Sequence, residues 1–264
     1  MARTAPEQQH YEDGDVSGHA GNQPHLPEAA ERAVQEVQRE RVPSGLALYK
    51  GRILLVAYVV VLVLVGALAF AAHTVSVLPG DLDATRELQE SHIPGLFALM
   101  YAVSYIGYPT LSGVILIVVT LLLALVRLWI AAGFLLLTLA ADGIGQVLKT
   151  VVGRQRPLPS LVHVVQQINN PSFPSGHTLH YTVFYGFLAF VLATEFRPSW
   201  PRNLLIAVSV LLVVLVGPSR VYLGEHWTSD VIGGYLIGLL CLVPLIAGYM
   251  WARRRFEARR AATS

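Results

Sequence analysis

Six long runs of apolar residues follow one another between residues 53 and 251. They cover residues 53–72, 111–126, 128–148, 178–194, 203–218 and 231–251. An α-helix rises about 1.5 Å per residue, so roughly 17 to 25 apolar residues cross the hydrocarbon core of a bilayer. The runs approach that length, and we therefore predict six membrane-spanning helices.

The composition agrees with this pattern and excludes two other classes of protein. Of the 264 residues, 54% are hydrophobic and 14% are charged, whereas charged residues make up about a quarter of a soluble domain. Only 16 of the 36 charged side chains lie within residues 53–251. The net charge of +2 and the scattered basic residues argue against a nucleic-acid partner. We predict an all-α polytopic membrane protein whose partner is the lipid bilayer, and no obligate protein partner is evident.

The chain divides by composition into a polar start, a membrane domain and a basic end. Residues 1–50 are rich in Gly, Pro, His, Gln and acidic side chains and begin without apolar periodicity, so we expect a cytoplasmic, largely disordered segment. Residues 51–252 contain the six runs and form the expected membrane domain. Residues 253–264 carry five arginines and are expected to form a basic cytoplasmic tail.

The segment between the first two runs has a pattern of its own. Residues 81–90 are acidic and polar, and Leu96, Leu99, Met100 and Val103 then recur at helical spacing. Apolar residues at such spacing indicate an amphipathic helix. We expect this helix to lie on the outer surface of the membrane.

The distribution of Lys and Arg sets the expected orientation. If the N-terminus is cytoplasmic, eleven Lys and Arg residues near the span ends lie inside and five lie outside. Positively charged loops remain in the cytoplasm, so we expect both termini there. The five residues outside are Arg86, Lys149, Arg154, Arg156 and Arg220.

Three polar motifs lie at the ends of spans on that same outer side. They are residues 149–157 (KTVVGRQRP), 174–177 (PSGH) and 219–230 (SRVYLGEHWTSD). Ionisable side chains are costly in lipid, so at span ends they need partners or a purpose. Because successive spans reverse direction, the three motifs emerge on one face and can form one active site.

The side chains of these motifs are suited to binding a phosphoryl group. Arg offers a planar fork of donors and Lys a compact charge, so Lys149, Arg156 and Arg220 can neutralise an anionic substrate. Ser175 and Gly176 stand at a predicted helix N-terminus, where free N–H groups and the helix dipole favour an anion. The motifs contain no cluster of carboxylates that could hold Mg²⁺, and they predict neither a metal nor another cofactor.

Two histidines in the motifs can carry a reaction. His226 and Asp230 are four residues apart, so they share a face if the sixth helix begins at or before His226. The carboxylate can then hold one ring nitrogen and leave the other free to attack phosphorus. His177 can donate a proton to the leaving oxygen. Each motif alone also suits a structural role, and it is their occurrence together on one face that favours catalysis.

Three further polar residues are possible accessory groups. Asp142 lies about two turns before Lys149 on the same helix face, where it either tunes that lysine or pairs with a neighbouring span. Arg154 either touches the substrate or faces the outer surface. Glu225, beside His226, is expected to make a structural or substrate-proximal hydrogen bond.

The order and spacing of the three motifs resemble a known family. Lys-x6-Arg-Pro, Pro-Ser-Gly-His and Ser-Arg-x5-His-x3-Asp look like the three-part signature of the type 2 phosphatidic acid phosphatase superfamily, in its integral-membrane bacterial branch. The motifs extend over residues 149–230, and we find no counterpart for residues 1–50. The matching positions are Lys149, Arg156, Pro157, Pro174, Ser175, Gly176, His177, Ser219, Arg220, His226 and Asp230.

The resemblance implies a metal-independent lipid phosphatase with six spans and an active site at the extracytoplasmic face. It also implies a role for each matched position. His226 would be the nucleophile that forms a phosphohistidine, and Asp230 would orient it. His177 would protonate the leaving group and then activate water. The phosphoryl oxygens would be held by Lys149, Arg156, Ser175, Gly176 and Arg220.

The substrate and two other functions remain open. Undecaprenyl diphosphate, phosphatidic acid and phosphatidylglycerol phosphate share the group that these motifs bind, and the resemblance favours the first for a bacterial chain. A lipid phosphotransferase would use the same site with another lipid as acceptor. A vanadate-dependent haloperoxidase is similar in its pocket residues, but that branch is soluble. A catalytically silent lipid-binding protein is the non-enzymatic alternative, against which the complete set of polar signature residues argues.

Overall fold

The computed structural model describes residues 44–263, and this part of the chain is helical without a strand. The expected disordered segment therefore lies mostly outside the described residues. Contacts divide the chain into two units, residues 1–53 and 54–264, and the site lies within the second. The helices are α2 (Ser44–Thr74), α3 (Asp81–Gln89), α4 (Leu96–Ile106), α5 (Pro109–Leu125), α6 (Trp129–Leu137), α7 (Leu139–Val152), α8 (Gly176–Glu195), α9 (Trp200–Tyr222) and α10 (Thr228–Thr263).

The structure contains fewer candidate membrane spans than the six that the sequence predicts. Among the described residues, four segments are long and apolar enough to cross a bilayer, and α4 with α5 makes a fifth if this pair, bent by 62°, is one span. The four segments are Gly51–Thr74, Trp129–Val152, Trp200–Tyr222 and Thr228–Ala261. α8 occupies the fourth predicted run, but it is not among them.

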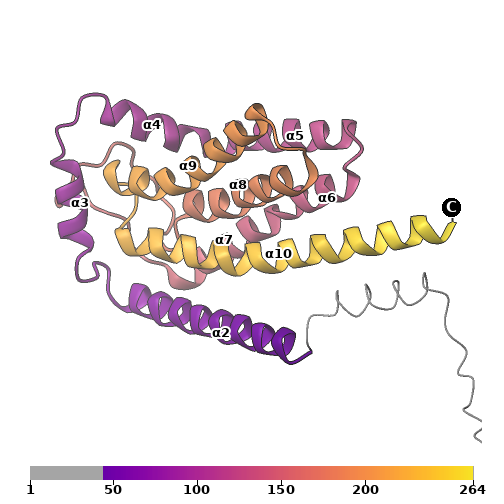
Figure 1. Ribbon diagram of the computed structural model, residues 1–264. Coiled ribbons are helices and arrows are strands. Elements are labelled where there is room, and N and C mark those ends of the chain that lie inside the picture. Colours follow the sequence, from indigo (N-terminus) through magenta and orange to yellow (C-terminus); the bar gives the residue numbers. More distant parts are fainter. Residues whose placement is uncertain (1–43, 264) are drawn as a thin grey trace, which may run out of the picture. The chain divides into compact units, whose positions relative to one another are not determined.

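The position of α8 explains why its composition is less apolar. α8 packs against α9, α10, α7 and α6, and Figure 1 shows it between α9 and α10. Ten of its 20 residues are buried, among them Thr178 and Thr182. A helix whose surroundings are mostly protein can keep polar side chains that a lipid-facing helix cannot.

Two glycines of α10 let this helix approach α8 closely. A Cβ atom on Gly238 would lie 2.7 Å from the Cβ atom of Thr182, and one on Gly234 would lie 2.8 Å from the carbonyl oxygen of Ser175. Small residues four apart on a helix commonly make such contacts in membranes. The backbone N–H of Ser175 donates to the carbonyl of Asp230 at 3.0 Å, so the start of α8 is fastened to the start of α10.

A helix, α4, is present where the sequence predicts an amphipathic one, but its exposed side is also apolar, with Phe97, Tyr101 and Tyr105 exposed. Met100 and Val103 are buried as expected, whereas Leu99 is exposed. The buried face contacts protein, because the hydroxyl of Tyr181 in α8 donates to the carbonyl of Val103 at 2.6 Å and α4 packs against α9. A position of α4 on the membrane surface stays a prediction.

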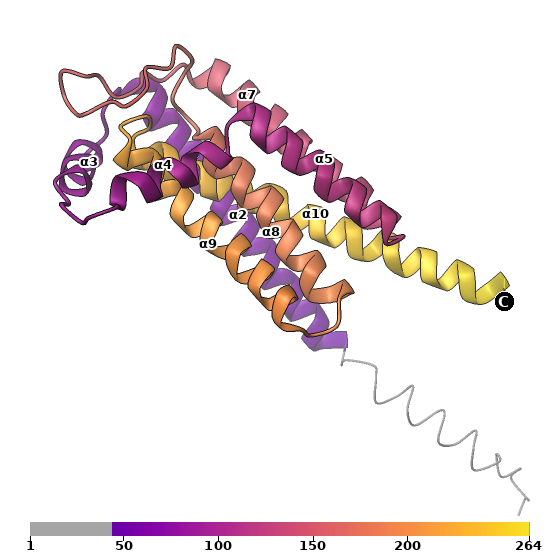
Figure 2. The same ribbon diagram turned by 90° about the horizontal axis from the view of Figure 1, so that it is seen from above.

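The residues of the three polar motifs meet at one end of the bundle. Figure 2 shows α3, α4 and the connection from α7 to α8 at the end opposite the C-terminus. The connection packs on the turn between α9 and α10, where Val165 N donates to the carbonyl of Leu223 at 3.0 Å. Gly224 has a φ of +68°, and a Cβ atom there would lie 2.0 Å from the carbonyl oxygen of His163. Glycine is therefore required for this close packing.

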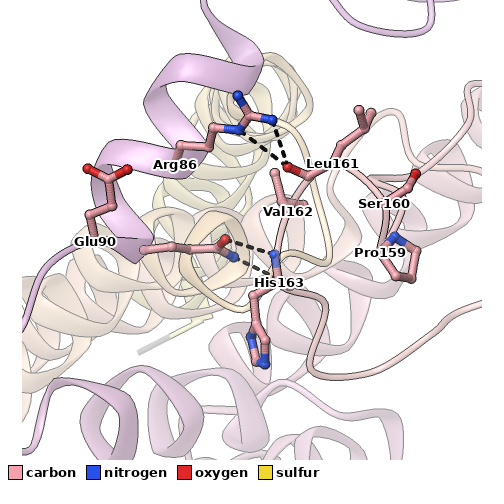
Figure 3. Close-up of a pocket in the computed structure, with 8 residues that line it drawn as sticks. Arg86, Glu90, Pro159, Ser160, Leu161, Val162 and His163 are labelled. Carbon is pink, nitrogen blue, oxygen red and sulfur yellow. Dashed lines mark hydrogen bonds between the residues drawn. The ribbon is translucent and has the colours of Figure 1, made fainter.

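α3 fastens the same connection from outside, beside a surface hollow (Figure 3). The side-chain amide of Gln89 donates to the carbonyl of His163 and accepts from its N–H, at 2.7 and 3.0 Å. Arg86 donates to the carbonyl of Leu161 at 3.2 Å. These polar groups of α3 are already hydrogen-bonded within the protein, so we interpret the contact as a structural one that stabilises the connection.

Candidate active site

One cavity of about 510 Å³ brings the expected catalytic residues together. It is lined by residues of all three motifs and also by residues of α5 and of the segment before it. Ser175 and Asp230 are fully buried and lie behind its wall. The residues of the signature that face the cavity are Lys149, Arg156, Gly176, His177, Arg220 and His226.

His226 presents one ring nitrogen to Arg156 and the other to the protein interior. Its Nε2 atom lies 3.2 Å from Nη1 of Arg156. Its Nδ1 atom lies 3.3 Å from Oγ of Ser172 and 3.5 Å from Oδ2 of Asp230. The hydroxyl of Ser172 donates to that same Asp230 oxygen at 2.5 Å. Ser172 therefore links the histidine to the carboxylate, and no motif in the sequence predicts this role.

The carboxylate of Asp230 is held by donors on both oxygens. Oδ2 accepts from the backbone N–H of Trp227 at 2.9 Å in addition to Ser172. Oδ1 accepts from Arg154 Nη1 at 2.6 Å. These donors fix the position of the carboxylate, so it offers a fixed acceptor next to Nδ1 of His226.

Arg154 neither faces the outer surface nor lines the cavity, the two positions expected from the sequence. Its side chain is 0% exposed and is absent from the lining of the cavity. It bridges two carboxylates instead, since Nη2 pairs with Asp81 at 2.7 Å while Nη1 pairs with Asp230. Asp81 in turn accepts from the backbone N–H of Ser229 at 2.9 Å. Arg154 and Asp81 thus hold Asp230 in position. The contribution of Asp81 is not predicted by any motif in the sequence.

The surroundings of His226 favour its neutral form. Burial lowers the pKa of this imidazole well below its usual value, and the positive charges of Arg156, Lys149 and Arg220 lower it further. Burial also lowers the pKa of Arg156 to about 10, against a raising effect of Asp230, so this guanidinium is charged at neutral pH. A neutral imidazole next to fixed positive charge is the state that a nucleophile requires.

Two of the expected phosphate-binding cations are oriented by backbone oxygens. Lys149 Nζ donates to the carbonyls of Pro171 and Ser172 at 2.8 and 3.3 Å. Arg156 donates to the carbonyls of Asn170 and Glu225 at 2.8 and 2.5 Å. Because these carbonyl partners carry no net negative charge, neither side chain is paired with a carboxylate in the described part of the chain.

Arg220 and Glu225 form a buried ion pair. Arg220 Nη2 donates to Oε2 of Glu225, and Nη1 donates to the hydroxyl of Ser104 in α4. Both charged side chains are about 1% exposed, and only Arg220 lines the cavity. The structure therefore assigns Glu225 the structural one of its two expected roles, and it adds Ser104 as a contact from α4.

His177 lies in the first turn of α8 and faces the cavity with an unused nitrogen. Within residues 44–263, its buried Nε2 atom has no hydrogen-bond partner. The ring packs edge-on against Tyr108, with centroids 5.6 Å apart. Gly107 leaves room for it, because a Cβ atom there would lie 2.4 Å from Cδ2 of His177.

The two small residues before His177 differ in what they can contact. Gly176 lines the cavity, and the first N–H groups of a helix have no partner within the helix. Ser175 is 0% exposed, and its hydroxyl accepts from Thr178 at 3.0 Å. Gly176 is thus placed to offer an anion its backbone, whereas Ser175 shapes the start of α8.

Asp142 pairs with a neighbouring helix rather than with Lys149. Its Oδ2 atom lies 3.0 Å from Nδ1 of His180 in α8. This is the second of the two roles expected for Asp142. In residues 44–263, no group of three or more His, Cys, Asp or Glu side chains is arranged to hold a metal ion.

A match to a family model confirms the family resemblance that the three motifs indicate. The model of the PAP2 superfamily matches residues 130–255, which include every signature residue, the whole of α7, α8 and α9 and most of α6 and α10. These residues belong to the PAP2 superfamily. The matched segment therefore contains all the signature residues that line the cavity, while Asp81, Ser104 and Ser112 precede it along the chain.

Relatives of the PAP2 domain include membrane lipid phosphatases. Phosphatidylglycerophosphatase B of Bacillus subtilis is 29% identical over 195 residues, which is 73% of this chain and 94% of that protein. An undecaprenyl-diphosphatase of Sulfolobus acidocaldarius is 36% identical over 98 residues, which cover 36% of this chain and 43% of that protein. The two proteins are named after different substrates, and both substrates are lipids that carry a phosphate group.

Two solved structures share the fold. A transmembrane PAP2-type phosphatidylglycerolphosphate phosphatase from Bacillus subtilis superposes with a TM-score of 0.62 at 26% identity, over 72% of this chain and 94% of that one. LpxE of Aquifex aeolicus gives a TM-score of 0.52 at 23% identity, over 66% of this chain and 98% of that one. Together with the apolar helices, these likenesses support a membrane location.

Proposed function

We propose that this protein is a membrane lipid phosphatase that removes the terminal phosphate of a lipid phosphate or diphosphate through a phosphohistidine. The observation that carries the proposal is the setting of His226: a neutral imidazole faces a cavity whose wall bears Lys149, Arg156, Arg220 and His177. The test is phosphate release by the purified protein, with EDTA present, from phosphatidic acid, phosphatidylglycerol phosphate and undecaprenyl diphosphate.

The first step transfers the phosphoryl group to the protein. Nδ1 of His226 keeps its proton, directed at Ser172 and Asp230, so the lone pair of Nε2 is free to attack phosphorus. A nitrogen–phosphorus bond forms while the bond from phosphorus to the leaving oxygen breaks. That oxygen takes a proton from His177, and the lipid leaves as an alcohol or as a monophosphate.

The second step returns His226 to its starting state. His177, now neutral, accepts a proton from a water molecule whose oxygen attacks phosphorus. The nitrogen–phosphorus bond breaks and its electron pair returns to Nε2, so inorganic phosphate is the second product. In both steps negative charge gathers on the equatorial oxygens, where Lys149, Arg156 and Arg220 stabilise it.

We place the active site on the extracytoplasmic side, with both termini in the cytoplasm and with α8 as one of six spans. The excess of Lys and Arg at the opposite span ends supports this orientation. The substrate is then presented from the outer leaflet. The basic residues at 253–259 continue helix α10 beyond the apolar part, so they would lie at the cytoplasmic surface.

Replacing His177 by alanine is expected to slow lipid phosphate hydrolysis by about 100- to 10,000-fold. The defect should depend on the leaving group. A nitrophenyl phosphate needs little proton donation, so its first step should recover in His177→Ala while the water step stays slow. Rapid-quench measurements should then show a burst of nitrophenol and an accumulating phosphoenzyme.

His180→Ala is the matched control for this variant, since His180 lies one turn further along α8 and outside the proposed proton path. It should show no burst with the nitrophenyl ester. An equal loss in His177→Ala for both kinds of leaving group, without a burst, would remove the general-acid role of His177.

The pH profile should show that His226 stays neutral below the usual imidazole range. A lowered pKa means that the proton is lost at a lower pH, so the acid-side fall of kcat/KM should lie below about pH 6.5. Arg156→Gln removes a neighbouring positive charge, which raises the pKa of His226. The acid-side fall should therefore move to higher pH, in addition to a lower maximal rate.

The comparison of the two profiles uses a single lipid phosphate, because the ionisation of the substrate is then common to both enzymes. Arg202→Gln is the control, because Arg202 lies at the start of α9, at the end of this helix away from the cavity. It should leave the pH of the acid-side fall unchanged. An acid-side fall that does not move in Arg156→Gln would show that His226 does not limit the reaction on that side.

A further inference from the structure

A second polar cluster lies in the same cavity, deeper in the helix bundle than the catalytic groups. Nδ1 of His180 lies 3.0 Å from Oδ2 of Asp142, and Nε2 lies 2.9 Å from the hydroxyl oxygen of Ser112. The three side chains come from α8, α7 and α5. All three line the cavity that His226 and His177 face, and the mechanism above uses none of them.

The sequence positions give the depth of this cluster. Asp142 precedes Lys149 by seven residues of α7, which is about 10 Å along the helix. His180 follows His177 by three residues of α8, which is about 4.5 Å. A molecule bound at His226 by its phosphate and extending into the bundle would therefore pass this cluster within one to two helical turns.

The remaining walls at this depth are largely apolar. Leu116, Leu139 and Leu179 line the cavity beside the cluster. Gly113 also lines it, and a Cβ atom on Gly113 would meet nothing within 4 Å, so the missing side chain leaves open space. At this depth the cavity wall is thus largely apolar apart from the cluster of Ser112, His180 and Asp142.

The cluster has hydrogen-bonding capacity left for a ligand. The side chain of Asp142 is 33% exposed and that of His180 is 12% exposed. A carboxylate can accept several hydrogen bonds, and a serine hydroxyl can both donate and accept, whereas one contact from His180 to each is present. Ionisable residues at membrane depth commonly mark a substrate pathway.

We infer that Ser112, His180 and Asp142 bind a glycerol oxygen of the substrate, either an ester oxygen or a hydroxyl, and so select a glycerophospholipid phosphate over a polyprenyl diphosphate. This inference rests on the proposed function, which places the phosphate at His226. In a glycerophospholipid phosphate, a hydroxyl or ester oxygen follows the phosphate within a few bonds. A polyprenyl diphosphate carries only hydrocarbon beyond its diphosphate and would place an alkyl chain against the unused hydrogen-bonding capacity of the cluster, which is costly for partly buried polar groups.

The order hydroxyl, imidazole, carboxylate is also that of a hydrolytic triad. Ser112 is, however, the fourth residue of α5, and its backbone N–H donates to the carbonyl of Tyr108 at 2.9 Å. That N–H is therefore not available to stabilise an oxyanion beside the hydroxyl. Binding of an oxygen, rather than cleavage of an ester, is the role that this geometry supports.

The test compares Ser112→Ala and Asp142→Asn with the unchanged protein on four substrates in mixed micelles. These are phosphatidic acid, phosphatidylglycerol phosphate, a polyprenyl diphosphate and dodecyl phosphate, which has no glycerol. For the unchanged protein, both glycerolipids should be preferred over the polyprenyl diphosphate. In each variant, kcat/KM for the glycerolipids relative to dodecyl phosphate should fall about fivefold, mainly through KM. Ser209→Ala, in α9 outside the cavity, should leave the ratio unchanged.

The substrates separate the two sources of the oxygen. A fall for both glycerolipids assigns the ester oxygens that they share, and a fall for phosphatidylglycerol phosphate alone assigns its head-group hydroxyl. Equal losses on all four substrates would show a merely structural cluster and overturn the inference, as would an unchanged ratio. Release of fatty acid that is lost in Ser112→Ala would overturn it in favour of ester cleavage.

A binding measurement keeps this inference separate from the proposed function. In a His226→Ala background, native mass spectrometry with the same lipids reads selectivity without turnover. If the unchanged protein hydrolyses none of them, the proposed function fails. Weaker glycerolipid binding in Ser112→Ala/His226→Ala than in His226→Ala would still support the cluster, and equal binding would overturn it.

Discussion

Turnover of a lipid phosphate is expected to fall at least about a thousandfold when His226 is replaced by alanine. His226 presents one ring nitrogen to Arg156, and Ser172 and Asp230 lie as fixed acceptors behind the other nitrogen. The loss should appear in kcat, because the cations that bind the phosphate stay in place. The measurement is phosphate release in detergent, with and without EDTA.

Two controls make this result specific. His92→Ala removes an exposed histidine outside the cavity and should keep full activity. His226→Ala should elute at the same volume on size exclusion and should lose the acid-labile, base-stable phosphoenzyme that labelled substrate forms with the unchanged protein. Retained turnover in folded His226→Ala would contradict the phosphohistidine mechanism.

The assembly of the catalytic groups could be predicted because it follows from the order of the spans. Lys149 ends one helix, His177 begins the next and His226 lies in the turn after the third, so alternation of direction alone places them on one side. Their residue types then fit one chemistry, a phosphoryl group held by cations and attacked by an imidazole. The cavity brings these groups together as that argument expects.

The groups that position the site could not be predicted, because they come from distant parts of the chain. Asp81 lies 148 residues before Ser229, yet it binds the backbone and hydroxyl of Ser229 and pairs with Arg154. In the sequence it is one acidic residue of a polar connection, and nothing in its neighbours indicates burial. Ser104 likewise reaches Arg220 across 116 positions.

The number of spans shows a different limit of sequence patterns. A run of apolar residues reports contact with lipid, whereas α8 is largely surrounded by other helices and carries threonines, tyrosines and two histidines. Its apolar content is therefore lower than that of α2, whose residues are mostly exposed. The same enclosure that makes α8 hard to count as a span is what allows it to hold His177 and His180 at the cavity.

Replacing Arg154 by methionine is expected to cause the second large loss, in stability and in activity together. The substitution keeps an unbranched stem, shortens the side chain and removes the guanidinium, so Asp81 and Asp230 become buried carboxylates without their cation. Removing one partner of a buried ion pair costs about 3 to 5 kcal/mol. At about 2 to 4 °C per kcal/mol for a chain of this size, the Tm should fall by roughly 10 °C. Because Asp230 loses its anchor, kcat should also fall about a hundredfold.

A double variant separates these two effects. Asp81→Asn combined with Arg154→Met removes one of the unpaired carboxylates, so it should recover part of the lost Tm. Its kcat should stay low, because Asp230 still lacks the guanidinium that fixes Oδ1. Arg197→Met, at an exposed position, is the matched control and should change neither quantity. If the double variant regains activity along with stability, Arg154 acts only as a structural ion pair; if stability returns without activity, the guanidinium is what orients Asp230 toward His226.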